Sequence, residues 1–154
     1  MADAMSNALA SSLLNLVLRN TAYNPANPNY LWIGLFHAST GLNGGSLADE
    51  VVKTAGGNYA RAQINLQSNQ EFTESTNGSV VRNQSDISFA TVTGTPVTDD
   101  WAVSGNEVTA AAIIDSSTLG AGTILIWGDF VQSKTIVVGD QFKLLAGDFK
   151  IQFT

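Results

Sequence analysis

Apolar and polar positions alternate over short runs along this chain, and turn residues separate the runs, a pattern that predicts mainly β-structure. The stretch 122–154 shows the pattern most clearly, because four short apolar runs are divided by turn dipeptides such as Gly139-Asp140 and Gly147-Asp148. Runs of this length with such punctuation are typical of consecutive antiparallel strands. In the closing run 149–153, every second residue is apolar, as expected of a half-buried strand. We therefore expect a β-meander at the C-terminal end of the chain.

A helical period occurs once, over residues 6–20. Ser6 is a suitable N-cap for this helix, and Arg19 would lie at its C-terminal end, where a cation is favourable. Leucines and a valine recur at the spacing of one helical stripe, which two further leucines widen: Leu9, Leu13, Leu16 and Val17, then Leu14 and Leu18. Two interpretations stay open. Either the helix caps the end of a β-sandwich, or part of its apolar surface contacts a neighbouring subunit.

Further apolar runs predict the remaining strands. Residues 30–37 are apolar on both faces, which indicates a strand in the interior of a sheet. Residues 59–66 alternate, so that Ala60 and Ile64 would face the core while Arg61 faces solvent. Short strands are also expected around 80–81 and 87–89.

Residues 107–115 would suit a helix on propensity alone, but the turn residues at both ends of this run favour a strand. The segment 40–57 is rich in Gly, Asn and Ser and reads as a long loop, with a short ordered piece at 49–52. Loops of this length usually make contacts. The expected fold is thus mainly β, an antiparallel, jelly-roll-like β-sandwich of about eight strands with one N-terminal helix. Residues 1–154 are expected to form a single domain.

Composition excludes several functions. The formal net charge is −6 with only seven Lys and Arg residues, so a basic surface for nucleic acid is not expected. The absence of cysteine excludes disulfides and thiolate chemistry. No Lys or Arg precedes Arg19, and the apolar run 13–18 is too short to span a bilayer. We expect a protein made in the cytoplasm, with no membrane partner.

Candidate catalytic and metal-binding residues are few. His37 is the only histidine, which excludes a pair of histidine ligands and makes a packed or hydrogen-bonded role the expectation. The acidic residues Asp99, Asp100, Asp140 and Asp148 lie in turns and are expected to accept hydrogen bonds from their own backbone. The three tryptophans adjoin apolar runs and are expected in the core. We therefore predict no enzymatic activity, no cofactor and no metal.

Several blocks of the sequence resemble a family of small virion proteins of tailed bacteriophages. The blocks are the segments 14–23 and 30–36, the run Gly-Asn-Tyr-Ala-Arg at 57–61, and the C-terminal segment 126–143 with Ala146-Gly147-Asp148. They are spread over most of the chain. The chain departs from the family pattern in the loop 40–57 and in the segment after Trp101. The family is described both as tail-fibre-like and as head decoration proteins, so the resemblance implies a structural role in the virion.

Our leading hypothesis is a capsid decoration (cement) protein that binds the outer surface of the phage head and stabilises contacts between capsomers. Its expected partners are the major capsid protein and copies of itself, in a dimer or trimer. The alternative is a tail or tail-fibre component involved in host attachment. The candidate contact residues come from the helix and from the loop 40–57: Leu9, Leu13, Leu16, Leu42, Leu47 and Val51.

Overall fold

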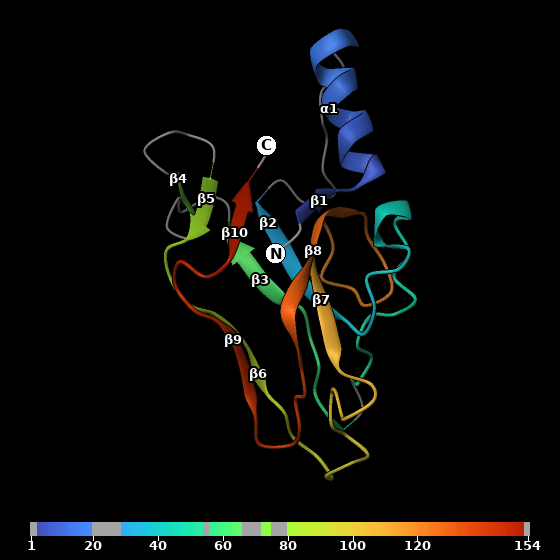
Figure 1. The fold of residues 1–154 in the computed structure, drawn as a ribbon, viewed down its shortest axis with the longest axis vertical. Coiled ribbons are helices and arrows are strands. Elements are labelled where there is room, and N and C mark those ends of the chain that lie inside the picture. The colour runs from blue at the N-terminus through green and yellow to red at the C-terminus, as the bar shows by residue number, and fades with distance from the viewer. Residues whose placement is uncertain (1–2, 20–28, 54–55, 66–71, 75–79, 153–154) are drawn as a thin grey trace.

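The computed structural model describes residues 3–19, 29–53, 56–65, 72–74 and 80–152 (Figure 1). The described residues form one α-helix, one 3-10 helix and ten strands. The elements in chain order are β1 (Asp3–Met5), α1 (Asn7–Arg19), β2 (Tyr30–Phe36), η1 (Leu42–Gly44), β3 (Ala62–Asn65), β4 (Phe72–Glu74), β5 (Val80–Asn83), β6 (Ile87–Thr91), β7 (Val108–Ile114), β8 (Ile124–Lys134), β9 (Gln141–Leu144) and β10 (Lys150–Gln152). The prediction of a mainly β fold with one N-terminal helix is confirmed.

The strands form three antiparallel sheets. The largest has five strands in the order β1-β8-β7-β2-β3, the second has the order β10-β5-β4, and the third is the β6-β9 pair. As predicted, β2 is an interior strand, and residues 108–114 form a strand and not a helix. Both faces of β2 are buried because apolar clusters lie on the two sides of the large sheet.

The larger of these clusters joins the five-stranded sheet to the other two sheets. Ile33 and Leu35 of β2 are fully buried there, together with Phe89 of β6 and Leu144 of β9. The smaller cluster lies on the opposite face of β2 and includes Phe36. Two apolar faces packed through a common core give the layered arrangement of a sandwich.

The smaller cluster depends on a close approach at Gly34 of β2. A Cβ atom at this position would lie 3.0 Å from Glu50 Oε1 and 3.0 Å from Ile114 Cδ1. A larger residue at this position would therefore push against the side chains of Glu50 and Ile114. Glu50 also forms an isolated bridge with Phe36. The short ordered piece expected at 49–52 thus lies against the C-terminal end of β2.

The C-terminal strands do not form the meander that the sequence predicts. The first two apolar runs belong largely to one long strand, β8, which pairs with β7 and β1. In contrast, β9 pairs with β6, and β10 pairs with β5. The turn signals locate the strand ends, but β9 and β10 pair with strands far away in the sequence, and β8, β9 and β10 lie in three different sheets.

Arg61 is also placed differently from the prediction. Ala60 is exposed, whereas Arg61 is buried, because both residues precede β3 and the alternation of that strand does not extend to them. Inside β3 the predicted burial of Ile64 is confirmed. Arg61 is bound to Glu50 in a two-pronged ion pair, with Nε–Oε1 and Nη2–Oε2 distances of 2.6 and 2.7 Å. Its Nη1 donates to the carbonyl oxygens of Ser116 and Ala121.

Candidate functional site

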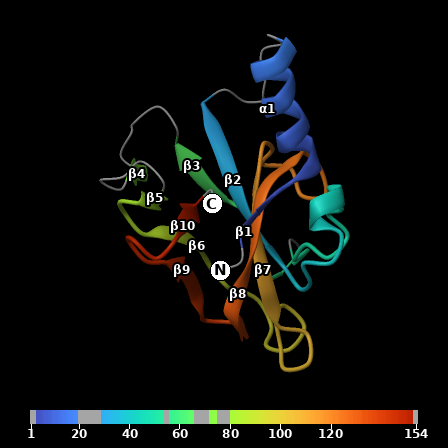
Figure 2. The same ribbon diagram turned by 45° about the horizontal axis from the view of Figure 1, so that its top comes forward.

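The helix α1 projects beyond the end of the five-stranded sheet, as both views of the ribbon show (Figures 1 and 2). Ser6 fixes its start, as predicted. Its Oγ accepts a hydrogen bond from the Leu9 N–H at 3.2 Å, and its own N–H donates to the Leu125 carbonyl of β8 at 2.9 Å. The first turn is therefore anchored to the sheet, and the rest of the helix extends away from it.

Most leucines of α1 have no apolar neighbours to cover them among the described residues. Leu14 and Leu18 are 59% and 74% exposed, and Leu13 and Leu16 are 38% and 41% exposed. Among the leucines of α1, which are all described, Leu9 alone packs against the larger core. The side chain of Val17 lies outside the described set. Arg19 is the only charged residue of the helix, so its long exposed surface is almost uncharged.

These leucines also border an apolar hollow with a volume of about 410 Å³. Met5, Ala10, Leu13, Leu14 and Leu18 line it. An uncharged, leucine-rich helix face next to such a hollow is typical of a surface that another protein chain covers.

The structure corrects part of the predicted contact set. Leu42 and Val51 are 1% and 0% exposed and belong to the cores, so neither side chain is available on the surface. Leu47 is partly buried against the smaller core. The loop is attached to β2 at Val51, because the Val51 N–H donates to the Leu35 carbonyl at 2.9 Å. Leu13 and Leu16 stay exposed, and the most exposed leucines, Leu14 and Leu18, were missing from the set.

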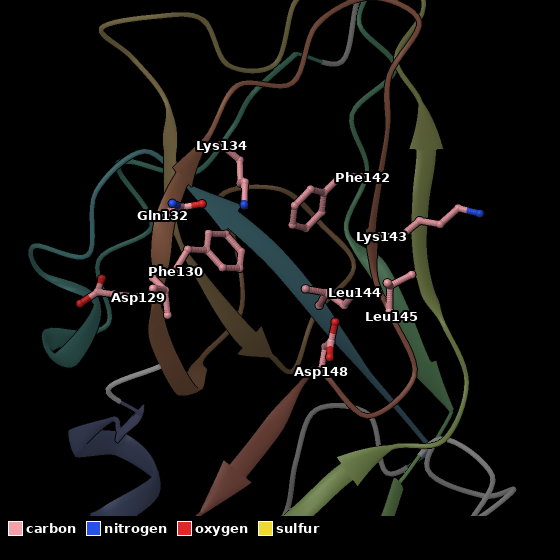
Figure 3. A pocket seen from close by; sticks show the side chains of 10 residues that line it. Asp129, Phe130, Gln132, Lys134, Phe142, Lys143, Leu144, Leu145 and Asp148 are labelled. Atoms are coloured by element: carbon pink, nitrogen blue, oxygen red, sulfur yellow. The ribbon is translucent and has the colours of Figure 1, made fainter.

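A second candidate surface is a groove of about 410 Å³ between β8 and β9 (Figure 3). The rings of Phe130 and Phe142 lie next to each other in it, with centroids 5.7 Å apart and planes inclined by 60°. Both rings are half-buried. Phe142 also packs edge-on against the buried ring of Phe89, with a centroid distance of 5.6 Å. The groove therefore has an aromatic floor that the core holds in place.

Polar side chains surround this floor. In Figure 3, Lys134 reaches into the groove from one end and Asp148 from the other, while Gln132 lies along the wall. None of these three side chains has a hydrogen-bond or ion-pair partner in the part of the chain that the structure describes. Lys143 lines the same groove but points away from it. The sequence did not single out this groove, because its two walls belong to different sheets.

The remaining candidates have structural roles. Nδ1 of His37 lies 3.2 Å from the Glu107 carbonyl oxygen. Asp100 accepts a hydrogen bond from the Val97 N–H and Asp140 accepts one from the Val137 N–H, as expected of turn acids. Asp100 also accepts one from the distant Val138 N–H. Trp101 is 1% exposed.

Within the described ranges, no group of three or more His, Cys, Asp or Glu residues is placed to hold a metal ion, and no helix there is long and apolar enough to cross a membrane.

The layered antiparallel sheets and the exposed apolar helix make this a β-rich protein with one projecting, leucine-rich helix. The model of one family, described as Podophage GP4 fiber I protein gp80, matches residues 4–152. The chain therefore belongs to this family of phage fibre proteins, which are structural proteins of the virion. Comparison with curated proteins gives no match.

Proposed function

We propose that this chain is a structural subunit of a podophage fibre and that it assembles with copies of itself through α1. The exposed leucines of α1 are the observation that carries the self-assembly. The family description as a fibre protein supports the placement in a fibre. Catalysis has no part in this proposal.

The energetics favour covering the helix. Burying a leucine side chain completely contributes about 1.5–3 kcal/mol. Leu14 and Leu18 expose 59% and 74% of their surface, so a partner that covers both can gain roughly 1–2 kcal/mol from each in every copy. Leu13 and Leu16 add a smaller gain. A contact of this kind is sufficient for an assembly in which many copies reinforce each other.

The charge distribution allows a second copy as the partner only through the helix. The chain carries a formal net charge of −6, so two copies repel each other over most of their surface. The helix carries one positive residue and projects away from the β-sheets. Two helices can therefore pack side by side while the acidic sheets stay apart, and the uncharged leucine face is complementary to itself.

The test is the oligomeric state of purified protein in sedimentation velocity. We expect the wild-type chain to form an oligomer and the double variant Leu14→Gln/Leu18→Gln to be monomeric, because glutamine keeps the helix propensity and removes the apolar surface. Val131→Thr is the matched control, since Val131 is 91% exposed on β8 and lies outside the helix. A monomeric wild-type protein, or a double variant that still assembles, would refute self-assembly through α1.

Attachment to the outer head surface is the alternative position for the protein. In that case the major capsid protein is the partner, and the chain stabilises contacts between capsomers. Electron microscopy of the virion with labelled protein separates the two positions. A copy number that follows the capsomers would establish the decoration role. A signal confined to a few fibres per particle is the result that our proposal expects.

A further inference from the structure

We propose that the groove between β8 and β9 is a saccharide-binding site. The groove combines an aromatic floor of Phe130 and Phe142 with polar groups at both ends. Its volume of about 410 Å³ lies in the usual range for small-ligand sites, which are mostly apolar with a few polar groups that fix the orientation of the ligand. The proposal does not depend on self-assembly through α1.

The floor fits one particular surface of a sugar. A pyranose ring presents a face of C–H groups that packs against aromatic rings, and its hydroxyl groups project around the edge. The two phenylalanine rings are inclined to each other by 60°, so they form a shallow trough. The edge-on packing of Phe142 against Phe89 keeps the trough open, because the ring has no space to turn into the core.

The rim supplies the polar contacts that a sugar needs. The Lys134 ammonium group donates hydrogen bonds, the Asp148 carboxylate accepts them, and the Gln132 amide does both. All three side chains are unpartnered among the described residues. Sugar hydroxyls donate and accept, so a single ring can satisfy groups of opposite charge at the two ends of the groove.

Other ligand classes fit less well. A wholly apolar ligand would leave the ammonium group and the carboxylate at the two ends without hydrogen bonds, which is unfavourable once water is excluded. Nucleic acid is repelled by a chain with a formal net charge of −6. A neutral polyhydroxylated ligand meets neither obstacle.

The place of the groove in the fold suits recognition. The groove is lined by residues 129–132, Lys134, residues 142–145 and Asp148, whereas α1 is anchored at Leu125, near the opposite end of β8. The part of β8 that bears the groove extends away from α1 (Figures 1 and 2). Contacts made through α1 therefore leave the groove accessible.

The test is a titration of the isotope-labelled full chain with the methyl glycosides of glucose, galactose, mannose and N-acetylglucosamine, followed through the backbone amide signals in NMR spectra. We expect at least one glycoside to cause saturable shifts confined to 129–134 and 141–148. Lys134→Ala should weaken that binding about tenfold, the usual loss for a hydrogen bond to a charged group. Lys150→Ala is the matched control, because Lys150 is an exposed lysine of β10 that does not line the groove, and we expect this variant to bind like the wild type.

Phe130→Leu completes the series, since leucine keeps apolar volume under the groove but removes the ring, and it should weaken binding without changing the rest of the spectrum. Absence of shifts with all four glycosides, shifts elsewhere on the chain, or equal affinities of Lys134→Ala and Lys150→Ala would overturn the proposal. So would groove signals that move with protein concentration in the absence of sugar, because a second copy would then be the occupant. The Leu14→Gln/Leu18→Gln variant should still bind the sugar, which separates this proposal from the assembly of the fibre.

Discussion

Tyr59 lies at the centre of the larger core. Its hydroxyl oxygen accepts a hydrogen bond from the Leu35 N–H at 2.8 Å, and its ring lies edge-on to Trp101 at a centroid distance of 5.0 Å. Burial raises the pKa of Tyr59 well above its ordinary value, because the phenolate would lose its hydration. The folded protein therefore keeps a proton that the unfolded chain loses at alkaline pH.

This difference makes stability depend on alkaline pH. In the unfolded chain Tyr59 loses its proton near pH 10, so its contribution to the free energy of unfolding is complete below about pH 10 and is lost as the pH rises further. The loss amounts to at most about 1.4 kcal/mol per pH unit for one group. Urea denaturation over a series of alkaline pH values should show a shallower decline for Tyr59→Phe than for the wild type. Equal slopes would mean that Tyr59 ionises in the folded protein.

The buried ion pair between Glu50 and Arg61 gives a larger effect at a single residue. Glu50→Gln leaves the buried Arg61 guanidinium group without its counter-charge, and it should lower the free energy of unfolding by roughly 3–5 kcal/mol. Glu107→Gln is the matched control, because Glu107 is half-exposed and lies outside this pair. Urea denaturation at neutral pH measures both variants. A loss from Glu50→Gln no larger than that of the control would show that water hydrates Arg61 in the folded protein.

At the scale of elements, Asn83 connects strands of two sheets. Its amide nitrogen lies 2.9 Å from the carbonyl oxygens of both Ser85 and Leu145, and its Oδ1 accepts hydrogen bonds from the Gly147 and Phe149 N–H groups at 3.1 and 3.0 Å. The side chain therefore ties the end of β5 to the turn between β9 and β10. Because these bonds use both ends of its amide, Asn83 is a structural residue.

Asn83→Ala should consequently destabilise the β5-β10 region more than an ordinary polar substitution does. Each buried backbone group left without a partner costs about 1–3 kcal/mol, so we expect a loss of at least about 3 kcal/mol. Hydrogen exchange of the β9 and β10 amides should accelerate together. Asn106→Ala, at an exposed turn, is the control and should change neither quantity appreciably. Unchanged exchange in Asn83→Ala would mean that the backbone pairing alone holds the turn.

Individual strands could be predicted from the sequence where a local pattern of apolar residues marks them. The apolar run of β2 predicts its interior position, and the alternation of β6 predicts that Phe89 points inward. The pairing of strands was not predictable, because alternation specifies which face of a strand is buried but carries no information about its partner. The sequence therefore does not indicate that β8, β9 and β10 lie in three different sheets, although they follow one another along the chain. The prediction that Arg61 faces solvent was wrong because its partner, Glu50, lies in a loop, where no periodic pattern indicates the ion pair.

At the scale of the whole molecule, the candidate surfaces depend on arrangements that the sequence does not encode locally. The leucine stripe and the N-cap predicted α1, but the exposure of Leu14 and Leu18 follows from the projection of the helix beyond the sheet. Leu42 and Val51 occur in a glycine-rich loop that looks solvated, yet the loop folds against β2. The groove around Phe130 exists only because two sheets meet there. That residues 1–154 form one domain stays a prediction.

The overall charge leads to a last prediction about assembly. Copies with a formal net charge of −6 repel each other, and this repulsion opposes the apolar contact between the helices. Salt screens charges over about 10 Å at 0.1 M, so self-association through α1 should strengthen as NaCl is added. Sedimentation velocity at low and high NaCl concentrations measures the dissociation constant, and Leu14→Gln/Leu18→Gln should stay monomeric at both. A dissociation constant that rises with salt would instead indicate an interface of paired charges, which the single charged residue of α1 does not provide.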